Sequence, residues 1–210
     1  MKAEHASAVV LAAGSSSRFG SAKLLAPLRG TSVLQHVLDA VAGVGFGEVV
    51  VVLGVSSSEI EAGTHWRRER RLCNLDSADG LSRSLRLGMG AVSSGSDAAM
   101  ILLGDQPLVS PEVMRRLLDE LVVGGRPVIL PLYSAGGGAN PVLIDRVAWH
   151  IADEATGDRG LGPVIRNHSE LVAEIAVEGY NPDIDTPADL AALEQAGPGG
   201  GGSAATLGSG

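Results

Sequence analysis

Cysteine and aromatic residues are scarce in this chain of 210 residues, and its histidines are few. The single cysteine, Cys73, excludes an intramolecular disulfide and a zinc site built from cysteines. The five histidines show no metal-binding spacing such as H-E-x-x-H, which argues against a histidine metal centre. Phe, Trp and Tyr occur twice each, so the core has to be formed by Val, Leu, Ile and Ala.

Long apolar runs and an excess of positive charge are also missing. The apolar runs, such as residues 49–53, have the length of strands and stay far below the roughly 20 residues that span a bilayer. Because no signal-type run stands near residue 1, we predict a cytoplasmic location. The 16 Lys and Arg against 24 Asp and Glu give a net charge of −8, which argues against nucleic acid or an anionic membrane as the partner.

The composition that is present fits one folded domain. Hydrophobic residues make up 45% of the chain, enough to bury a core, and the length fits one domain better than two. We predict a single domain over residues 1–195. Residues 196–210 contain seven of the 29 glycines and no charged residue, and we expect them to form a flexible tail.

Strand-like apolar runs alternate with amphipathic stretches, which is typical of an α/β fold with a mostly parallel sheet covered on both faces. A helix is expected over residues 32–41, and further helices start at Ser110-Pro111-Glu112 and at Thr186-Pro187. The expected strands are residues 6–13, 48–53, 71–75, 98–103, 127–130 and 171–177. Ligands of such sheets bind beyond the carboxyl ends of the strands, so the loops that follow the strands are the candidate site.

The loop after the first expected strand, residues 14–23, is rich in Gly and Ser and contains Arg18 and Lys23. Backbone N–H groups and cations in this pattern suit phosphate oxygens. No acidic residue stands between His5 and Leu38, so a chain of negative charge has a locally positive segment here. The spacing matches neither the P-loop nor the dinucleotide fingerprint, and an ordinary solvated turn is the alternative.

Aspartates follow two of the later strands. Asp105 comes directly after residues 98–103, where an isolated charge favours a metal or hydrogen-bond donors; the alternative is a turn cap before Pro107. Asp183 and Asp185 are two residues apart, so in an extended segment they point the same way and can share a cation with Asp105. Asp189 is better explained as a helix-start residue. The alternative for this whole segment is a generally acidic surface.

Several of these segments together resemble one family. Residues 11–14 read Leu-Ala-Ala-Gly, residues 18–20 read Arg-Phe-Gly, and residues 23–25 read Lys-Leu-Leu, followed by Pro27-Leu28. This pattern resembles the nucleotidyltransferases with a glycosyltransferase-A-like fold, and among them the molybdenum cofactor cytidylyltransferases. The resemblance implies a three-layer αβα sandwich of Rossmann type with a mostly parallel mixed sheet.

The resemblance also implies roles for individual residues. Arg18 and Lys23 would be catalytic cations on the triphosphate, and Asp105 would bind Mg²⁺ with a second contact from Asp185, which we favour over Asp183. Ala13 stands where guanylyl-transferring relatives carry glycine, which favours a pyrimidine base. Residues 134–141 and Arg159 would face the acceptor. The nucleotide contacts implied are Leu11, Ala12, Ala13, Gly14, Ser15, Lys23, Asn74, Gly80, Leu81, Ser82 and Asp105. For the segment around Gly80, ordinary helix capping by Ser82 or Asp79 is the alternative.

The implied reaction is transfer of CMP from CTP to the phosphate of the molybdopterin-bound molybdenum cofactor, with release of pyrophosphate. A phosphate monoester is mostly ionised at neutral pH, so the reaction needs no side-chain base, in keeping with the lack of a catalytic triad. The alternatives are guanylyl transfer to the same cofactor, transfer to a sugar, polyol or phospholactate acceptor, and a non-catalytic cofactor carrier. A transient contact with the molybdenum enzyme that receives the product is also expected.

Overall fold

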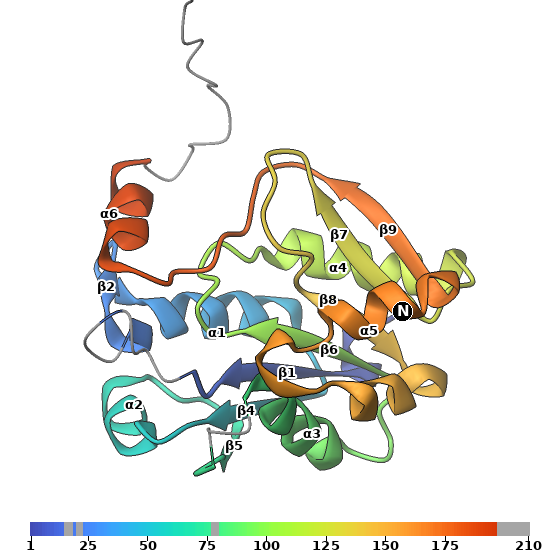
Figure 1. The fold of residues 1–210 in the computed structure, drawn as a ribbon, viewed down its shortest axis with the longest axis horizontal. Helices are drawn as coiled ribbons and strands as arrows, with labels where there is room; N and C mark the ends of the chain where they lie inside the picture. Colours follow the sequence, from blue (N-terminus) through green and yellow to red (C-terminus); the bar gives the residue numbers. More distant parts are fainter. Residues whose placement is uncertain (15–18, 20–22, 77–79, 197–210) are drawn as a thin grey trace, which may run out of the picture.

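The computed structural model describes residues 1–14, 19, 23–76 and 80–196. They form a seven-stranded sheet in the order β5-β4-β1-β6-β8-β7-β9 (Figure 1). β8 runs antiparallel to both of its neighbours, β6 and β7. The other four pairings of this sheet are parallel. The strands are β1 (Ala6–Ala12), β4 (Glu48–Leu53), β5 (Arg70–Cys73), β6 (Ala98–Leu103), β7 (Val128–Tyr133), β8 (Val142–Asp145) and β9 (Val172–Val177).

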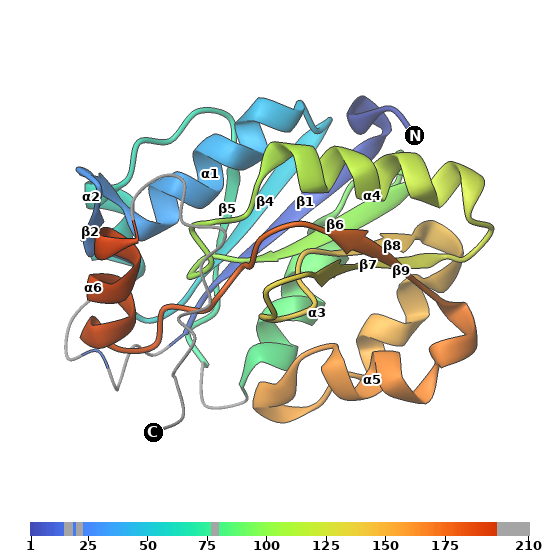
Figure 2. The same cartoon turned by 90° about the horizontal axis from the view of Figure 1, so that it is seen from above.

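Helices cover both faces of this sheet, which confirms the predicted three-layer sandwich. Figure 2 shows α1 (Val33–Val44) and α4 (Pro111–Val123) on one side, and α3 (Leu81–Ala91) and α5 (Gly162–Asn167) on the other. The 3-10 segment η4 (Arg146–Glu154) packs on the same face as α3. Each layer closes over its own apolar core.

β1 explains why two cores form. All seven of its residues are buried, and its side chains alternate between the faces: Val10 and Ala12 join the core under α1 and α4, whereas Val9 and Leu11 join the core under α3. A central parallel strand covered on both faces therefore reads as a continuous apolar run, the pattern that predicted it.

The predicted helix starts are confirmed. The hydroxyl oxygen of Ser32 accepts from the backbone N–H of Gln35 at the start of α1, and Ser110 does the same for Val113 at the start of α4. Thr186 caps α6 (Pro187–Gln195) in the same way.

A smaller unit lies beside the main sheet. β2 (Pro27–Leu28) and β3 (Thr31–Ser32) form a two-stranded antiparallel sheet, and α6 packs next to β2 (Figure 1). Their core consists of Leu28, Val33, Ile184 and Leu193. The remaining short elements are η1 (Ala3–His5), η2 (Lys23–Leu25), α2 (Ser57–Gly63), η5 (Gly157–Arg159) and η6 (Ser169–Leu171).

The sequence pattern did not predict β8 or the short strands β2 and β3. All six expected strands are present: β4 and β6 have the predicted bounds, and β1, β5, β7 and β9 have shifted ends. Residues 197–210, most of the predicted tail, lie outside the described residues. In the described part of the chain, no helix is both long and apolar enough to cross a membrane.

Candidate active site at the carboxyl edge of the sheet

The site lies where the parallel strands end. Close backbone contacts hold these ends together: a Cβ on Gly54, after β4, would lie 2.6 Å from the carbonyl oxygen of Ala13, after β1. A Cβ on Gly104, after β6, would lie 3.1 Å from the Cβ of Ala12. The backbone N–H of Gly104 donates to the carbonyl oxygen of Leu11 at 2.8 Å. Glycine at these two positions lets the loops after β1, β4 and β6 approach one another.

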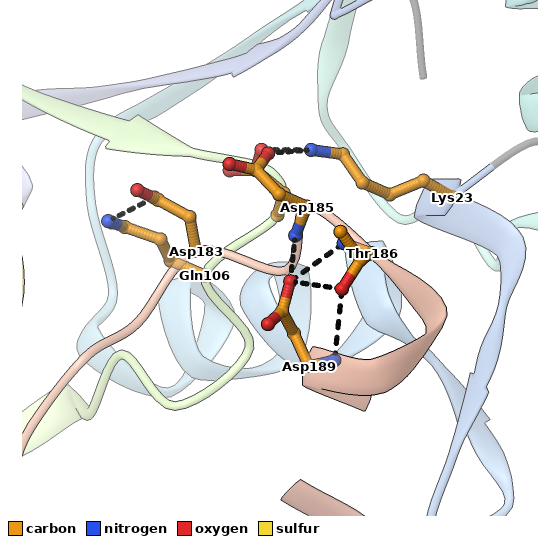
Figure 3. Close-up of polar contacts among 7 residues, drawn as sticks. Lys23, Gln106, Asp183, Asp185, Thr186 and Asp189 are labelled. Carbon is orange, nitrogen blue, oxygen red and sulfur yellow. Dashed lines mark hydrogen bonds and ion pairs between the residues drawn. The ribbon is translucent and has the colours of Figure 1, made fainter. Parts of the chain in front are cut away.

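Lys23 lies between two carboxylates that come from distant parts of the chain. Its Nζ is 2.7 Å from Oδ2 of Asp105 and 3.2 Å from Oδ1 of Asp185. Figure 3 shows the Lys23 side chain pointing toward Asp185. The lysine side chain is 9% exposed, against 23% for Asp105 and 53% for Asp185. Burial alone lowers the pKa of Lys23, but the Asp105 and Asp185 carboxylates outweigh it, so the pKa is raised and the ammonium stays charged.

The segment around Asp185 is extended and anchored to the turn after β6. The backbone N–H of Ile184 donates to the carbonyl oxygen of Asp105 at 3.0 Å, and the Ile184 side chain is fully buried in the core beside α6. With Ile184 turned inward, Asp183 and Asp185 are exposed, as the two-residue spacing predicted. Their partners differ: Asp185 meets Lys23, whereas Oδ1 of Asp183 accepts from Gln106 Nε2 at 2.8 Å.

Asp183 and Asp189 have opposite electrostatic surroundings. Loss of solvation, with the nearby Asp105 carboxylate, raises the pKa of Asp183. Hydrogen bonds from the Thr186 side chain and backbone hold the pKa of Asp189 below its usual range. Oδ2 of Asp189 also accepts from the backbone N–H of Asp185 at 3.0 Å (Figure 3). Asp189 and Thr186 form a capping box, which confirms Asp189 as a helix-start residue.

A buried amide network supports this segment, and sequence reasoning missed it. Asn181 is fully buried, and its Nδ2 donates to Oε1 of Gln106 at 3.2 Å and to the carbonyl oxygen of Asn140 at 3.4 Å. The Tyr133 hydroxyl donates to the same Asn140 carbonyl at 3.1 Å, and burial raises the pKa of Tyr133 to about 12 although Asn181 acts in the other direction. The signal available in the sequence was a polar residue, Gln106, directly beside Asp105.

The predicted nucleotide contacts from Leu11 to Gly14 lie at the end of β1 and directly after it, at the carboxyl edge of the sheet. The side chains of Leu11 and Ala12 are buried in opposite cores, and Leu11 also lines a cavity beside α3. Ala13 is nearly buried, and Gly14 is exposed. Ser15 and Arg18 lie outside the described residues, and so their predicted roles stay predictions.

The predicted contacts after β5 lie around the start of α3. Asn74 is buried: its Nδ2 donates to Oγ of Ser84, and its Oδ1 accepts from the backbone N–H of Asp76. The bond to Ser84 joins the end of β5 to α3. Gly80 has a φ of 76° and precedes α3, whose first residues are Leu81 and the buried Ser82. The structure therefore places the Asn74 side chain against α3, and Leu81 at the start of α3 lines a cavity.

The turn at 157–160 packs directly on the α3 start. A Cβ on Gly80 would lie 2.6 Å from the carbonyl carbon of Gly157, and one on Gly160 would lie 2.8 Å from Cδ2 of Leu81. Beside this contact is a cavity of about 200 Å³, lined mainly by apolar side chains, with Asn140 and Arg159 among its polar residues. Leu81, a predicted nucleotide contact, therefore lines the same cavity as Asn140 and Arg159, which are predicted to face the acceptor.

The two carboxylates on Lys23 suit a hard divalent cation. In the described residues, no group of three or more His, Cys, Asp or Glu side chains is arranged to hold a metal by itself. Mg²⁺ is commonly bound through one or two carboxylates together with substrate phosphates and water. Asp105 and Asp185 already hold one cation, the Lys23 ammonium, between them. This pair therefore fits a metal that a phosphate substrate helps to bind.

Known structures share this architecture. The structure of Rv0371c from Mycobacterium tuberculosis H37Rv is similar, with a TM-score of 0.81, 30% identity and coverage of 92% of this chain and 99% of that chain. A second structure of that protein, in complex with manganese, has a TM-score of 0.78 at 29% identity, over 91% of this chain and 98% of that one. The nucleotidyl transferase Mth528 from Methanothermobacter thermautotroptrophicus has a TM-score of 0.74 at 26% identity, over 90% and 96%.

Fold and site together thus define an NTP transferase domain. The sequence profile of the MobA-like NTP transferase domain matches residues 8–172, and the chain belongs to this family. Among curated proteins, the bifunctional protein GlmU of Sorangium cellulosum is 31% identical over 186 residues, which cover 84% of this chain. The match covers 37% of that GlmU, so the chain spans about a third of the relative's length.

Proposed function

We propose that this chain is a nucleotidyltransferase that moves a nucleoside monophosphate from an NTP to a phosphate acceptor. The convergence of Lys23 with Asp105 and Asp185 at the carboxyl edge carries the proposal. It combines a cation for phosphate oxygens with carboxylates for a divalent metal, beside the loop after β1. Family membership supports the same reaction class.

The proposed reaction is an in-line displacement. An oxygen of the acceptor phosphate forms a bond to the α-phosphorus of the NTP, the bond to the bridging oxygen breaks, and pyrophosphate leaves with that electron pair. The acceptor oxygen is already ionised, so no residue has to remove a proton. The work of the protein is to position and neutralise the phosphates: Lys23, the backbone after β1 and, in the proposal, Arg18 bind the triphosphate.

Asp105 and Asp185 would hold the divalent cation. When bound, Mg²⁺ would offset negative charge on the phosphates. Gln106 holds Asp183, and the Ile184 N–H fixes the segment to Asp105, so the chain keeps Asp185 facing Asp105. The manganese complex of Rv0371c supports a divalent cation in this fold.

For the substrates, we propose CTP and the phosphate of a molybdopterin-type cofactor. Ala13 in place of glycine supports the smaller pyrimidine base, and the resemblance of residues 11–28 supports the acceptor. Transfer of GMP to the same cofactor, and transfer to a sugar, polyol or phospholactate acceptor, fit the same site. The implied delivery of the product to a molybdenum enzyme belongs to this proposal.

A substrate panel tests the proposal. The protein is incubated with Mg²⁺, each of the four common nucleoside triphosphates and each acceptor class, and pyrophosphate is measured. We expect the highest release with CTP and the molybdenum cofactor. Release that peaks with another pair keeps the reaction class and changes the substrates. Binding of the cofactor without pyrophosphate from any pair identifies a carrier and contradicts the proposed enzyme.

A further inference from the structure

We infer that Lys23 is a stand-in for the metal ion: in the metal-free protein its ammonium holds Asp105 and Asp185 together, and it leaves them when the divalent cation binds. The inference rests on the proposed function, because it concerns the same site. It gives Lys23 a positioning role before the triphosphate arrives, in addition to the proposed contact with the triphosphate.

The distances carry the first step. One nitrogen atom lies 2.7 Å from an oxygen of Asp105 and 3.2 Å from an oxygen of Asp185. Both carboxylates are thus aimed at one point although they lie on different segments, and that point is occupied by the ammonium. Mg²⁺ binds oxygen at about 2.0–2.1 Å. A metal bound by both oxygens would take the position of the ammonium, so the two cations compete for the same carboxylates.

Burial carries the second step. The Lys23 side chain is 9% exposed, so its charge has little access to water and depends on these carboxylates for compensation. When a metal takes over the carboxylates, the ammonium needs another anion nearby. A triphosphate bound at the loop after β1 provides one. A metal that binds alone therefore has to compete with the Lys23 ammonium for the two carboxylates. When the metal binds together with a triphosphate, the ammonium can move from the carboxylates to the phosphates.

The chain offers a matched pair of variants, since it contains two lysines. Lys2 is 80% exposed and pairs with Glu4 at the surface, away from the site, so Lys2→Met removes the same charge without touching the carboxylates. Lys23→Met removes the stand-in cation and keeps a side chain of similar length. Lys23→Arg keeps the charge and presents a guanidinium to the same carboxylates.

The test is a titration of the protein with Mn²⁺ in the absence of nucleotide. Electron paramagnetic resonance measures the concentration of free Mn²⁺. We expect Lys23→Met to bind Mn²⁺ about tenfold more tightly than wild type because the competing charge is gone, while Lys2→Met and Lys23→Arg gain no affinity. Binding of CTP in the presence of a chelator should weaken in Lys23→Met. Equal or weaker Mn²⁺ binding by folded Lys23→Met overturns the stand-in role alone, whereas wild-type protein that binds neither Mn²⁺ nor CTP overturns the proposed function as well.

A second measurement needs no variant. With ¹⁵N-labelled lysine, the wild-type protein has two side-chain ammonium groups to observe by NMR. Titration with Mg²⁺ should shift the Lys23 resonance and leave that of Lys2 in place. A Lys23 resonance that does not move while Mg²⁺ binding is seen by calorimetry contradicts the exchange.

Discussion

The two edges of the main sheet both contain polar clusters, but the clusters are built in opposite ways. At the amino edge, Ser7 Oγ lies 2.6 Å from Ser96 Oγ and donates to Glu48 Oε2 at 3.2 Å, and Glu48 Oε2 also accepts from the Ser93 backbone N–H. Each polar group there has a partner from the neighbouring strands or loops. A cluster of this kind joins strands and leaves little for a ligand to change.

At the carboxyl edge, by contrast, charge is concentrated. Asp105 and Asp185 share the Lys23 ammonium, and the Asp183 pKa is raised by loss of solvation and by these acids. Like charges gathered at one place cost stability unless a cation offsets them. The difference teaches that the polar groups of the amino edge hold strands together, whereas the carboxyl edge gathers charges of the kind that the proposed cation and phosphate binding requires.

Asp105→Asn gives the largest expected effect and tests this contrast directly. Removal of one charged ligand from a site that stabilises phosphoryl charge should lower turnover by about 10²–10³-fold. Pyrophosphate release at saturating Mg²⁺ and NTP measures it, with circular dichroism to show that the variant is folded. Turnover within a few-fold of wild type would remove Asp105 from the proposed metal site.

Glu48→Gln is the matched change at the amino edge. It replaces a carboxylate that accepts from Ser7 and Ser93, and we expect a loss of about 1 kcal/mol in the free energy of unfolding. Turnover at a temperature where the variant is folded should not change. Urea denaturation measures the stability and the pyrophosphate assay measures the turnover. A large loss of turnover without loss of stability would contradict a purely structural role for the amino edge.

Thr186→Ala tests how the carboxyl edge is supported. The capping hydroxyl of α6 is lost, and helix-cap substitutions of this kind cost about 1 kcal/mol. Asp189 has a lowered pKa in the folded protein, so its stabilising effect is present above the usual aspartate pKa of about 3.9 and is lost as the pH falls through the folded value. The stability difference between Thr186→Ala and wild type should therefore shrink in acid, as urea denaturation at several pH values would show. A difference independent of pH would contradict the role of the Asp189 carboxylate.

Asp183→Asn gives the smallest expected effect, with the opposite sign. Because the folded pKa of Asp183 is raised, ionisation opposes folding as the pH rises through the unfolded and then the folded pKa. The amide oxygen of Asn still accepts from Gln106, so the variant should be slightly more stable than wild type at neutral pH and equal to it in strong acid. Thermal denaturation at neutral and at strongly acidic pH measures this difference. A variant that is less stable than wild type at neutral pH would show that the ionised Asp183 carboxylate does not destabilise the fold.

The local parts of this molecule could be predicted from the sequence. The apolar run of β1, the helix starts at Ser110 and Thr186 and the sandwich itself depend on patterns within a few residues. β8 was missed because it is four residues long, follows a glycine-rich stretch and runs antiparallel without a helix before it, which breaks the strand and helix alternation.

Spacing alone predicted the site only within short segments, and the grouping of Lys23 with Asp105 and Asp185 came from the family resemblance. The spacing of Asp183 and Asp185 indicated that both face one way, but it did not separate their partners. That separation depends on Gln106, whose amide selects Asp183 through contacts across 77 positions of chain. The buried Asn181 network has no periodic pattern in the sequence, because its members meet only after the sheet has formed.

The 162 positions between Lys23 and Asp185 have a consequence for synthesis on the ribosome. A nascent chain that has emerged as far as the turn after β6 contains Lys23 and Asp105 but lacks Asp185, so it can pair the lysine with one acid before the second is present. The candidate site is therefore among the last parts of the domain to be completed, after both apolar layers have most of their residues in place.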